Sequence, residues 1–164
     1  MNATASSTAA TQTAAAGLGE EFGSTPATVM LWALKSAYAH LDDCIARMEV
    51  AAGCPRPDME SLATARFKIS QASLARRQLL HNACDHLLGI VTGAEAQTLR
   101  SLKRDSIAHA AASIEHVRRW PVAQTERNWS GYREASRKIR ARMKQAMRDE
   151  QRLLFPLLAR YEQH

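Results

Sequence analysis

The sequence predicts an all-α protein, built as an up-down-up-down antiparallel four-helix bundle. The composition is the first observation, because Ala, Leu and Arg are abundant whereas the 164 residues include only seven Gly and five Pro. Runs of alternating Val, Ile and Thr, which are typical of strands, are missing. The few Pro and Gly residues separate long helical stretches, and short connections between long helices favour antiparallel neighbours.

The first two helices are predicted from their end signals. Thr25 is a good N-cap with Pro26 at the first helical position, and Gly53 closes this helix. The next segment, CPRPD, cannot continue it because it contains two prolines. Asp58 can cap a second, long helix, for which Gly93 is the expected stop.

Two more helices complete the predicted bundle. The third is expected from about Ala94 to Trp120, where Pro121 ends it. The fourth is expected from about Ser130 to Tyr161. A chain of this length can bury a single core, so residues 24–164 are predicted to form one domain.

The remaining composition bears on compartment and processing. Residues 1–23 are rich in Ala, Thr and Ser and lack the basic and Leu-rich regions of a secretory signal, so we expect a disordered low-complexity tail. Three cysteines without framework spacing favour reduced thiols and a cytoplasmic protein. No stretch approaches the roughly 20 apolar residues of a membrane span, so no membrane association is expected.

The net charge of +6 suggests acidic partners at most. Much of that charge lies on the fourth predicted helix. These residues spread around the helix, have few aromatic neighbours and match no nucleic-acid-binding motif, so a solvated face is predicted and no nucleic acid partner. The basic residues concerned are Arg133, Arg137, Lys138, Arg140, Arg142, Lys144, Arg148 and Arg152.

Candidate metal ligands begin with a pair on the second helix. His81 and Asp85 stand four residues apart, so both project from one helix face, about one turn from each other. Such a pair can offer a metal one imidazole nitrogen and one carboxylate oxygen. Helical bundles use related pairs to hold two iron ions bridged by carboxylates.

A weak internal repeat adds further candidates. The segment AHLDDCIARM resembles AHAAASIEHV, which aligns His40 with His109 on the first and third helices. A fainter match of the second and fourth helices sets Asp85 against Glu150. The candidate metal ligands, with at least one from every helix, are therefore His40, His81, Asp85, His109 and Glu150.

With the segment EQRLLFPLL at 150–158, these residues resemble the hemerythrin-like, or HHE cation-binding, domains. That family has a histidine on helices 1 and 3, His-x-x-x-Glu on helix 2, and His-x-x-x-Glu leading into Leu-Phe-Pro-Leu on helix 4. The resemblance covers residues 30–162. It implies a hemerythrin-like bundle that binds non-haem iron and binds or senses dioxygen, nitric oxide or iron, without substrate turnover and hence not as an enzyme.

Two departures from the family pattern leave the metal content open. Ala146 stands at the position of the helix-4 histidine, and Asp85 replaces the usual glutamate. The site can then be di-iron with water filling the gap, a degenerate single-ion site, or empty. The alternative function is a metal-free bundle that acts as a regulatory or protein-interaction module.

The same residues also have plainer interpretations. Asp85 and Glu150 can face outward, where Arg148 and Arg152 lie close enough to pair with Glu150. Cys44 and Cys84 can be small core residues, or thiols that replace the missing ligand or sense oxidants.

Overall fold

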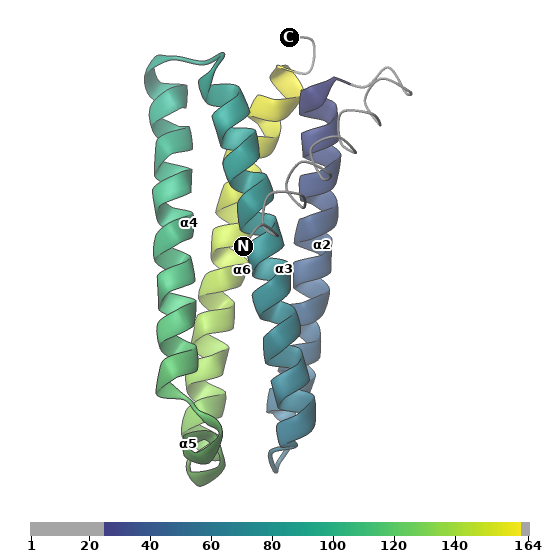
Figure 1. Ribbon diagram of the computed structural model, residues 1–164, viewed down its shortest axis with the longest axis vertical. Coiled ribbons are helices and arrows are strands. Elements are labelled where there is room, and N and C mark those ends of the chain that lie inside the picture. Colours follow the sequence, from purple (N-terminus) through teal and green to yellow (C-terminus); the bar gives the residue numbers. More distant parts are fainter. Residues whose placement is uncertain (1–24, 162–164) are drawn as a thin grey trace, which may run out of the picture.

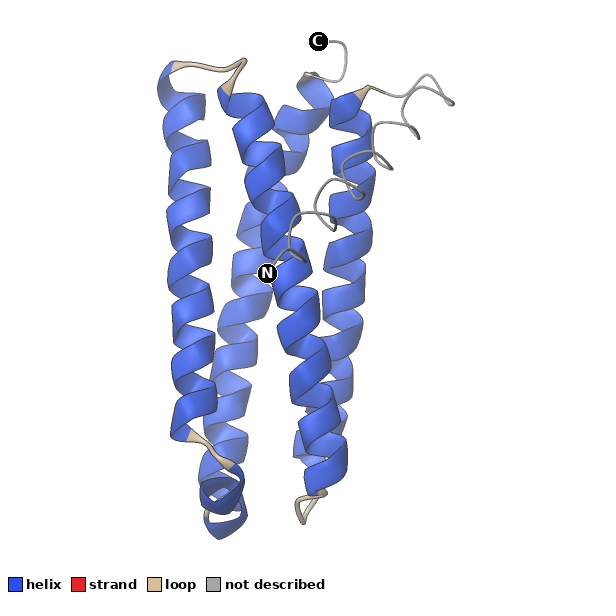
Figure 2. Ribbon diagram, in the orientation of Figure 1, coloured by secondary structure: helices blue, strands red, loops and turns tan. Residues whose placement is uncertain are grey.

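The computed structural model describes residues 25–161, and the prediction of an all-α chain is confirmed over this range, which contains no strand (Figure 2). The predicted tail, 1–23, lies outside the described residues. None of the described helices is long and apolar enough to cross a membrane. The helices are α2 (Pro26–Gly53), α3 (Met59–Leu88), α4 (Gly93–Arg119), α5 (Val122–Arg127) and α6 (Trp129–Arg160).

The predicted start signals of the first two helices are confirmed. The Thr25 side chain caps α2 by accepting a hydrogen bond from the Thr28 amide at 3.3 Å. The Asp58 carboxylate caps α3 by accepting from the amides of Glu60 and Ser61, at 3.1 and 3.2 Å. These side chains satisfy amide groups that have no partner inside the helix.

Replacing Asp58 with alanine is therefore expected to lower the free energy of unfolding by about 1 kcal/mol. Asparagine at position 58 keeps an oxygen that accepts from the same amides, so Asp58→Asn is the matched control and should change stability much less. Urea denaturation of both variants measures the difference. Equal losses in the two variants would show that the cap contributes nothing beyond its charge.

The predicted stop of the second helix is wrong. Helix α3 ends at Leu88, and Gly93 instead begins α4 with a positive φ of 61°. The chain leaves α3 early because Val91 is buried in the main apolar cluster, which pulls the connection inward. The Gly89 amide donates to the His86 carbonyl at 3.2 Å and closes the last turn of α3.

Helix α5 was not predicted and occupies the connection between α4 and α6. Pro121 stops α4, as expected, and then stands at the start of α5. Thr125 is fully buried, and its hydroxyl donates to the Trp120 carbonyl at 3.3 Å. Asn128 then caps α6 by accepting from the Gly131 amide at 3.0 Å.

The four long helices lie side by side, and Figure 1 shows α5 at the end farthest from the α3–α4 connection. Helix α2 packs against α3 and α6, and α4 packs against the same two helices. One large apolar cluster fills the half near the α3–α4 connection, and a smaller one around Tyr132 lies near α5. Within residues 25–161 the buried polar and charged residues are Arg76, Ser106, Thr125, Ser136, Arg140 and Glu150.

Candidate functional site

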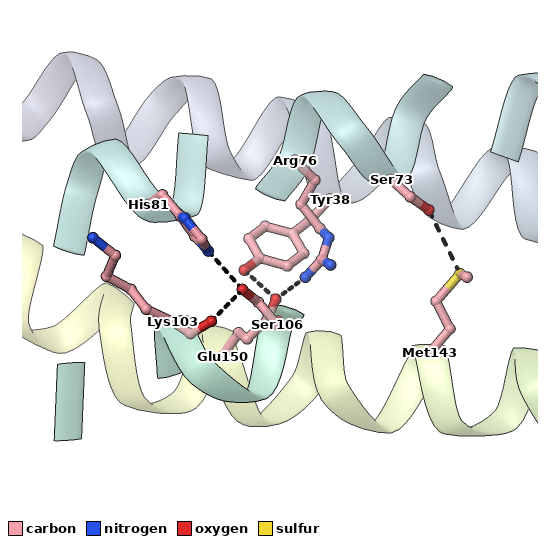
Figure 3. Close-up of polar contacts among 8 residues, drawn as sticks. All are labelled: Tyr38, Ser73, Arg76, His81, Lys103, Ser106, Met143 and Glu150. Atoms are coloured by element: carbon pink, nitrogen blue, oxygen red, sulfur yellow. Dashed lines mark hydrogen bonds and ion pairs between the residues drawn. The ribbon is translucent and has the colours of Figure 1, made fainter. Parts of the chain in front are cut away.

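Glu150 lies in the core, where it is held by two side chains from other helices. It is only 4% exposed on α6. Its Oε2 accepts a hydrogen bond from the Tyr38 hydroxyl of α2 at 2.7 Å and from Arg76 Nη1 of α3 (Figure 3). Arg76 is 5% exposed, and its guanidinium also lies over the Tyr38 ring, 5.8 Å from the ring centre.

The arginine balances the charge that the carboxylate brings into the core. A buried carboxylate without a partner is costly, whereas one that is paired and hydrogen-bonded is tolerated. Burial, and then the charge of Glu150, raise the pKa of Tyr38. The hydroxyl therefore stays protonated and remains a hydrogen-bond donor to Glu150.

His81 is held by a neighbouring helix. Its Nε2 lies 2.7 Å from the Ser106 hydroxyl oxygen of α4, and that hydroxyl donates to the Lys103 carbonyl at 2.8 Å (Figure 3). Nε2 can donate to the Ser106 oxygen or accept its proton, depending on the histidine tautomer. In either tautomer Nε2 is bonded to Ser106, so a metal ion would have to displace that hydrogen bond.

Asp85 faces solvent although it lies one turn from His81. Its side chain is 59% exposed and pairs with Lys103 Nζ at 2.5 Å. The alternative prediction that these two acids face outward is therefore right for Asp85 and wrong for Glu150, which is buried. The two arginines predicted as alternative partners of Glu150 bind elsewhere, because Arg148 donates to Gln145 and Arg152 to Asp149.

The two histidines aligned by the repeat lie in different surroundings. His40 is exposed on α2, with its Nε2 3.9 Å from Cys44 Sγ. His109 is half-buried on α4 and lines a cavity, and its buried Nδ1 has no hydrogen-bond partner. The pseudo-symmetry inferred from the sequence is therefore absent from their environments.

As they lie, the five candidate ligands do not fit an iron centre. Within residues 25–161, no group of three or more His, Cys, Asp or Glu side chains is arranged to hold a metal ion. Glu150 is paired with an arginine, Asp85 points outward, and Ala146 offers no ligand atom on α6. Each polar head has its own protein environment rather than a shared one.

The buried cysteines behave as core residues. Cys44 and Cys84 are both buried and unpaired. Burial raises the pKa of Cys84 to about 12, so its thiol stays protonated at neutral pH. A protonated thiol is a poor metal ligand and a poor nucleophile, which favours the packing interpretation for Cys84.

A cavity of about 430 Å³ opens between α3, α4 and α6. Its described lining includes no Asp or Glu but has two histidines, His109 and His116, and six arginines. We call it the arginine cavity after those arginines: Arg66, Arg76, Arg77, Arg118, Arg140 and Arg142.

Arg140 is the most unusual member of this lining. It was predicted to lie on a solvated face, but it is only 8% exposed, so that prediction is wrong for this residue. Its Nη1 donates to the Ser136 hydroxyl, and its Nε has no hydrogen-bond partner. Burial lowers the pKa of Arg140, which is the mark of a cation held away from water.

The sequence holds a signal for the residues that were missed. Arg76 falls on the buried stripe of α3, between Ala72 and Leu80. Arg140 falls on the buried stripe of α6, as does Glu150, which the sequence did predict. A charged residue at a position with core spacing predicts a buried ion pair or a ligand site.

The environments of His81 and His116 make stability depend on pH. Burial is the main cause that lowers the pKa of both histidines below the ordinary value of 6.5, and nearby cations add to it. The cations near His81 are Lys103 and Arg77. Those near His116 are Arg66, Arg140 and Arg119. For His81 the charges of Asp85 and Glu150 act in the opposite direction. Both histidines are therefore less easily protonated in the folded protein than in the unfolded chain.

The free energy of unfolding is expected to fall as the pH drops through 6.5 and to go on falling until the lowered pKa values are passed. Below 6.5 the unfolded chain takes up protons that the folded protein does not. Urea denaturation between about pH 7.5 and about pH 5.5 measures this slope. Replacing His81 and His116 together by glutamine should flatten it, and an unchanged slope in that double variant would contradict the assignment.

No family model, no curated protein and no solved structure matches the chain. The likeness to the hemerythrin-like domains thus rests on the short motifs of the sequence and stays a prediction.

Proposed function

We propose that this protein is a metal-independent, antiparallel four-helix bundle that acts as a regulatory binding module without substrate turnover. The observation that carries the proposal is the position of the Arg76 guanidinium beside Glu150, the most deeply buried of the five candidate ligands. A cation from the protein itself balances the carboxylate that iron would otherwise bind.

Electrostatics supports this choice. A ferrous ion at Glu150 would have to displace Arg76 or share the carboxylate with it at close range, in a setting where like charges repel strongly. Displacing Arg76 would leave the guanidinium buried without its carboxylate. The alternative of an iron module that binds dioxygen or nitric oxide requires a rearrangement of this pair, together with an inward turn of Asp85.

Thermal melts with and without ferrous iron, under reducing and anaerobic conditions, test the proposal. The wild-type protein is expected to melt at the same temperature in both, because Arg76 already balances the Glu150 carboxylate. Asp85→Asn is expected to change stability by about 1 kcal/mol or less, since it removes one exposed ion pair. The iron module requires instead that iron raises the melting temperature of the wild type and that Asp85→Asn abolishes the gain.

Ala146→His supplies a second arm, because it restores the family's missing imidazole. Iron loading of this variant should stay at the wild-type level, since Arg76 still pairs with Glu150. A rise in iron content with an intact fold would show that the imidazole alone was lacking and would overturn the proposal.

A further inference from the structure

We propose that the arginine cavity binds a small amphipathic anion, with an apolar body and one anionic head, of which a medium-chain carboxylate is the simplest example. This inference deepens the proposed function by naming a ligand class, and it rests on Arg76 staying beside Glu150. It needs no metal, so it can fail while the metal-independence of the bundle stands.

Charge is the first argument. None of the described lining residues carries a negative charge, whereas six are arginines. Arg76 is neutralised by Glu150, but the hydrogen bond of buried Arg140 goes to the Ser136 hydroxyl and not to an acid. The charge of Glu49 acts on Arg140, but its carboxylate is bonded to Lys144. A buried cation without an anion is costly, and an anionic head group beside Arg140 would compensate it.

Unsatisfied polar atoms are the second argument. Four polar atoms are buried without a hydrogen-bond partner, and the residues that carry them all line the cavity: Arg76 Nε, Arg140 Nε, His109 Nδ1 and the Tyr132 hydroxyl. Buried polar groups are normally paired, so four unpaired groups around one space indicate a missing partner. Water can accept a hydrogen bond there, but only an anion also balances the arginine charge.

The rest of the wall is apolar and suits the body of such a molecule. Ile69, Ile139 and Met143 line the interior, and Leu74, Ile114 and Val117 are 46%, 62% and 46% exposed. A volume of 430 Å³ lies within the usual range for small-molecule sites. The anionic head is thus expected at Arg140 and the apolar chain towards the exposed side chains of α3 and α4.

Calorimetric titration of the full chain with decanoate, in the presence of a chelator, tests the inference. About one decanoate per chain should bind, and decanol and acetate should each bind at least about tenfold more weakly, because they lack the head group or the chain. Equal affinity for decanoate and decanol would show a nonspecific apolar surface. No binding of decanoate would also overturn the inference. Binding of decanoate only when iron replaces the chelator would overturn both the inference and the proposed metal-independent function.

Two pairs of variants locate the site. Arg140→Met should weaken decanoate binding by about tenfold or more, whereas Arg133→Gln, an exposed residue of the same helix outside the lining, should leave it unchanged. Ile114→Glu places a negative charge at the exposed wall and should also weaken binding. Its matched control is Ile107→Glu, because Ile107 is 57% exposed on the same helix but does not line the cavity.

Both replaced isoleucines are exposed, so this second pair does not depend on a core substitution that folds poorly. Equal effects of Ile114→Glu and Ile107→Glu, or equal effects of the two arginine substitutions, would place the ligand elsewhere and overturn the inference.

Discussion

Replacing Glu150 with alanine is expected to lower the free energy of unfolding by about 3–5 kcal/mol, the usual cost of removing one partner from a buried ion pair. Arg76 would remain 5% exposed without a carboxylate, and the Tyr38 hydroxyl would lose its acceptor. Denaturation in guanidinium chloride, followed by circular dichroism, measures the loss.

The double variant Arg76→Met/Glu150→Met is the control for this prediction. It removes both charges and keeps apolar volume, so it should recover most of the stability that the single change removes. Two results would show that Arg76 and Glu150 do not depend on each other in the core: a loss of less than about 1 kcal/mol in Glu150→Ala, or a double variant that is less stable than Glu150→Ala.

Arg140→Met is expected to stabilise the protein and, at the same time, to weaken ligand binding. In the protein without ligand it should raise the free energy of unfolding by about 1–2 kcal/mol, because it replaces a buried cation that forms no ion pair within residues 25–161 with an apolar side chain of similar length. At the same time it should remove the affinity for decanoate. A residue that weakens the fold and strengthens ligand binding is typical of a functional site.

Parallel urea denaturation of wild type, Arg140→Met and Arg133→Gln measures this effect. The exposed control should stay within about 0.5 kcal/mol of wild type. A destabilised Arg140→Met protein would show that Arg140 contributes packing and hydrogen bonding that outweigh the cost of its charge.

Local signals predicted much of the fold. Thr25 and Asp58 cap the helices they were expected to cap, and Pro121 stops α4. Each of these effects acts over a few residues, so a short window of sequence contains it. The end of α3 was missed because Val91 is drawn into a core built from distant residues, which no local pattern records.

The candidate site was harder to predict because its contacts span the chain. Glu150 is predicted as a metal ligand or as a partner of the nearby Arg148 and Arg152, but its partner Arg76 lies 74 positions away. The repeat aligned His40 with His109, yet one is exposed and the other lines the cavity. Spacing along one helix fixes which residues share a face, but not which neighbouring helix that face meets.

Metal analysis of the full chain tests most directly whether Arg76, rather than iron, balances Glu150. The protein is purified without chelator, incubated with ferrous iron under anaerobic and reducing conditions, desalted and assayed for iron. We expect far less than one iron ion per chain and no change in Glu150→Gln. One or two retained iron ions per chain, lost in Glu150→Gln, would contradict the metal-independent bundle and restore the hemerythrin-like site.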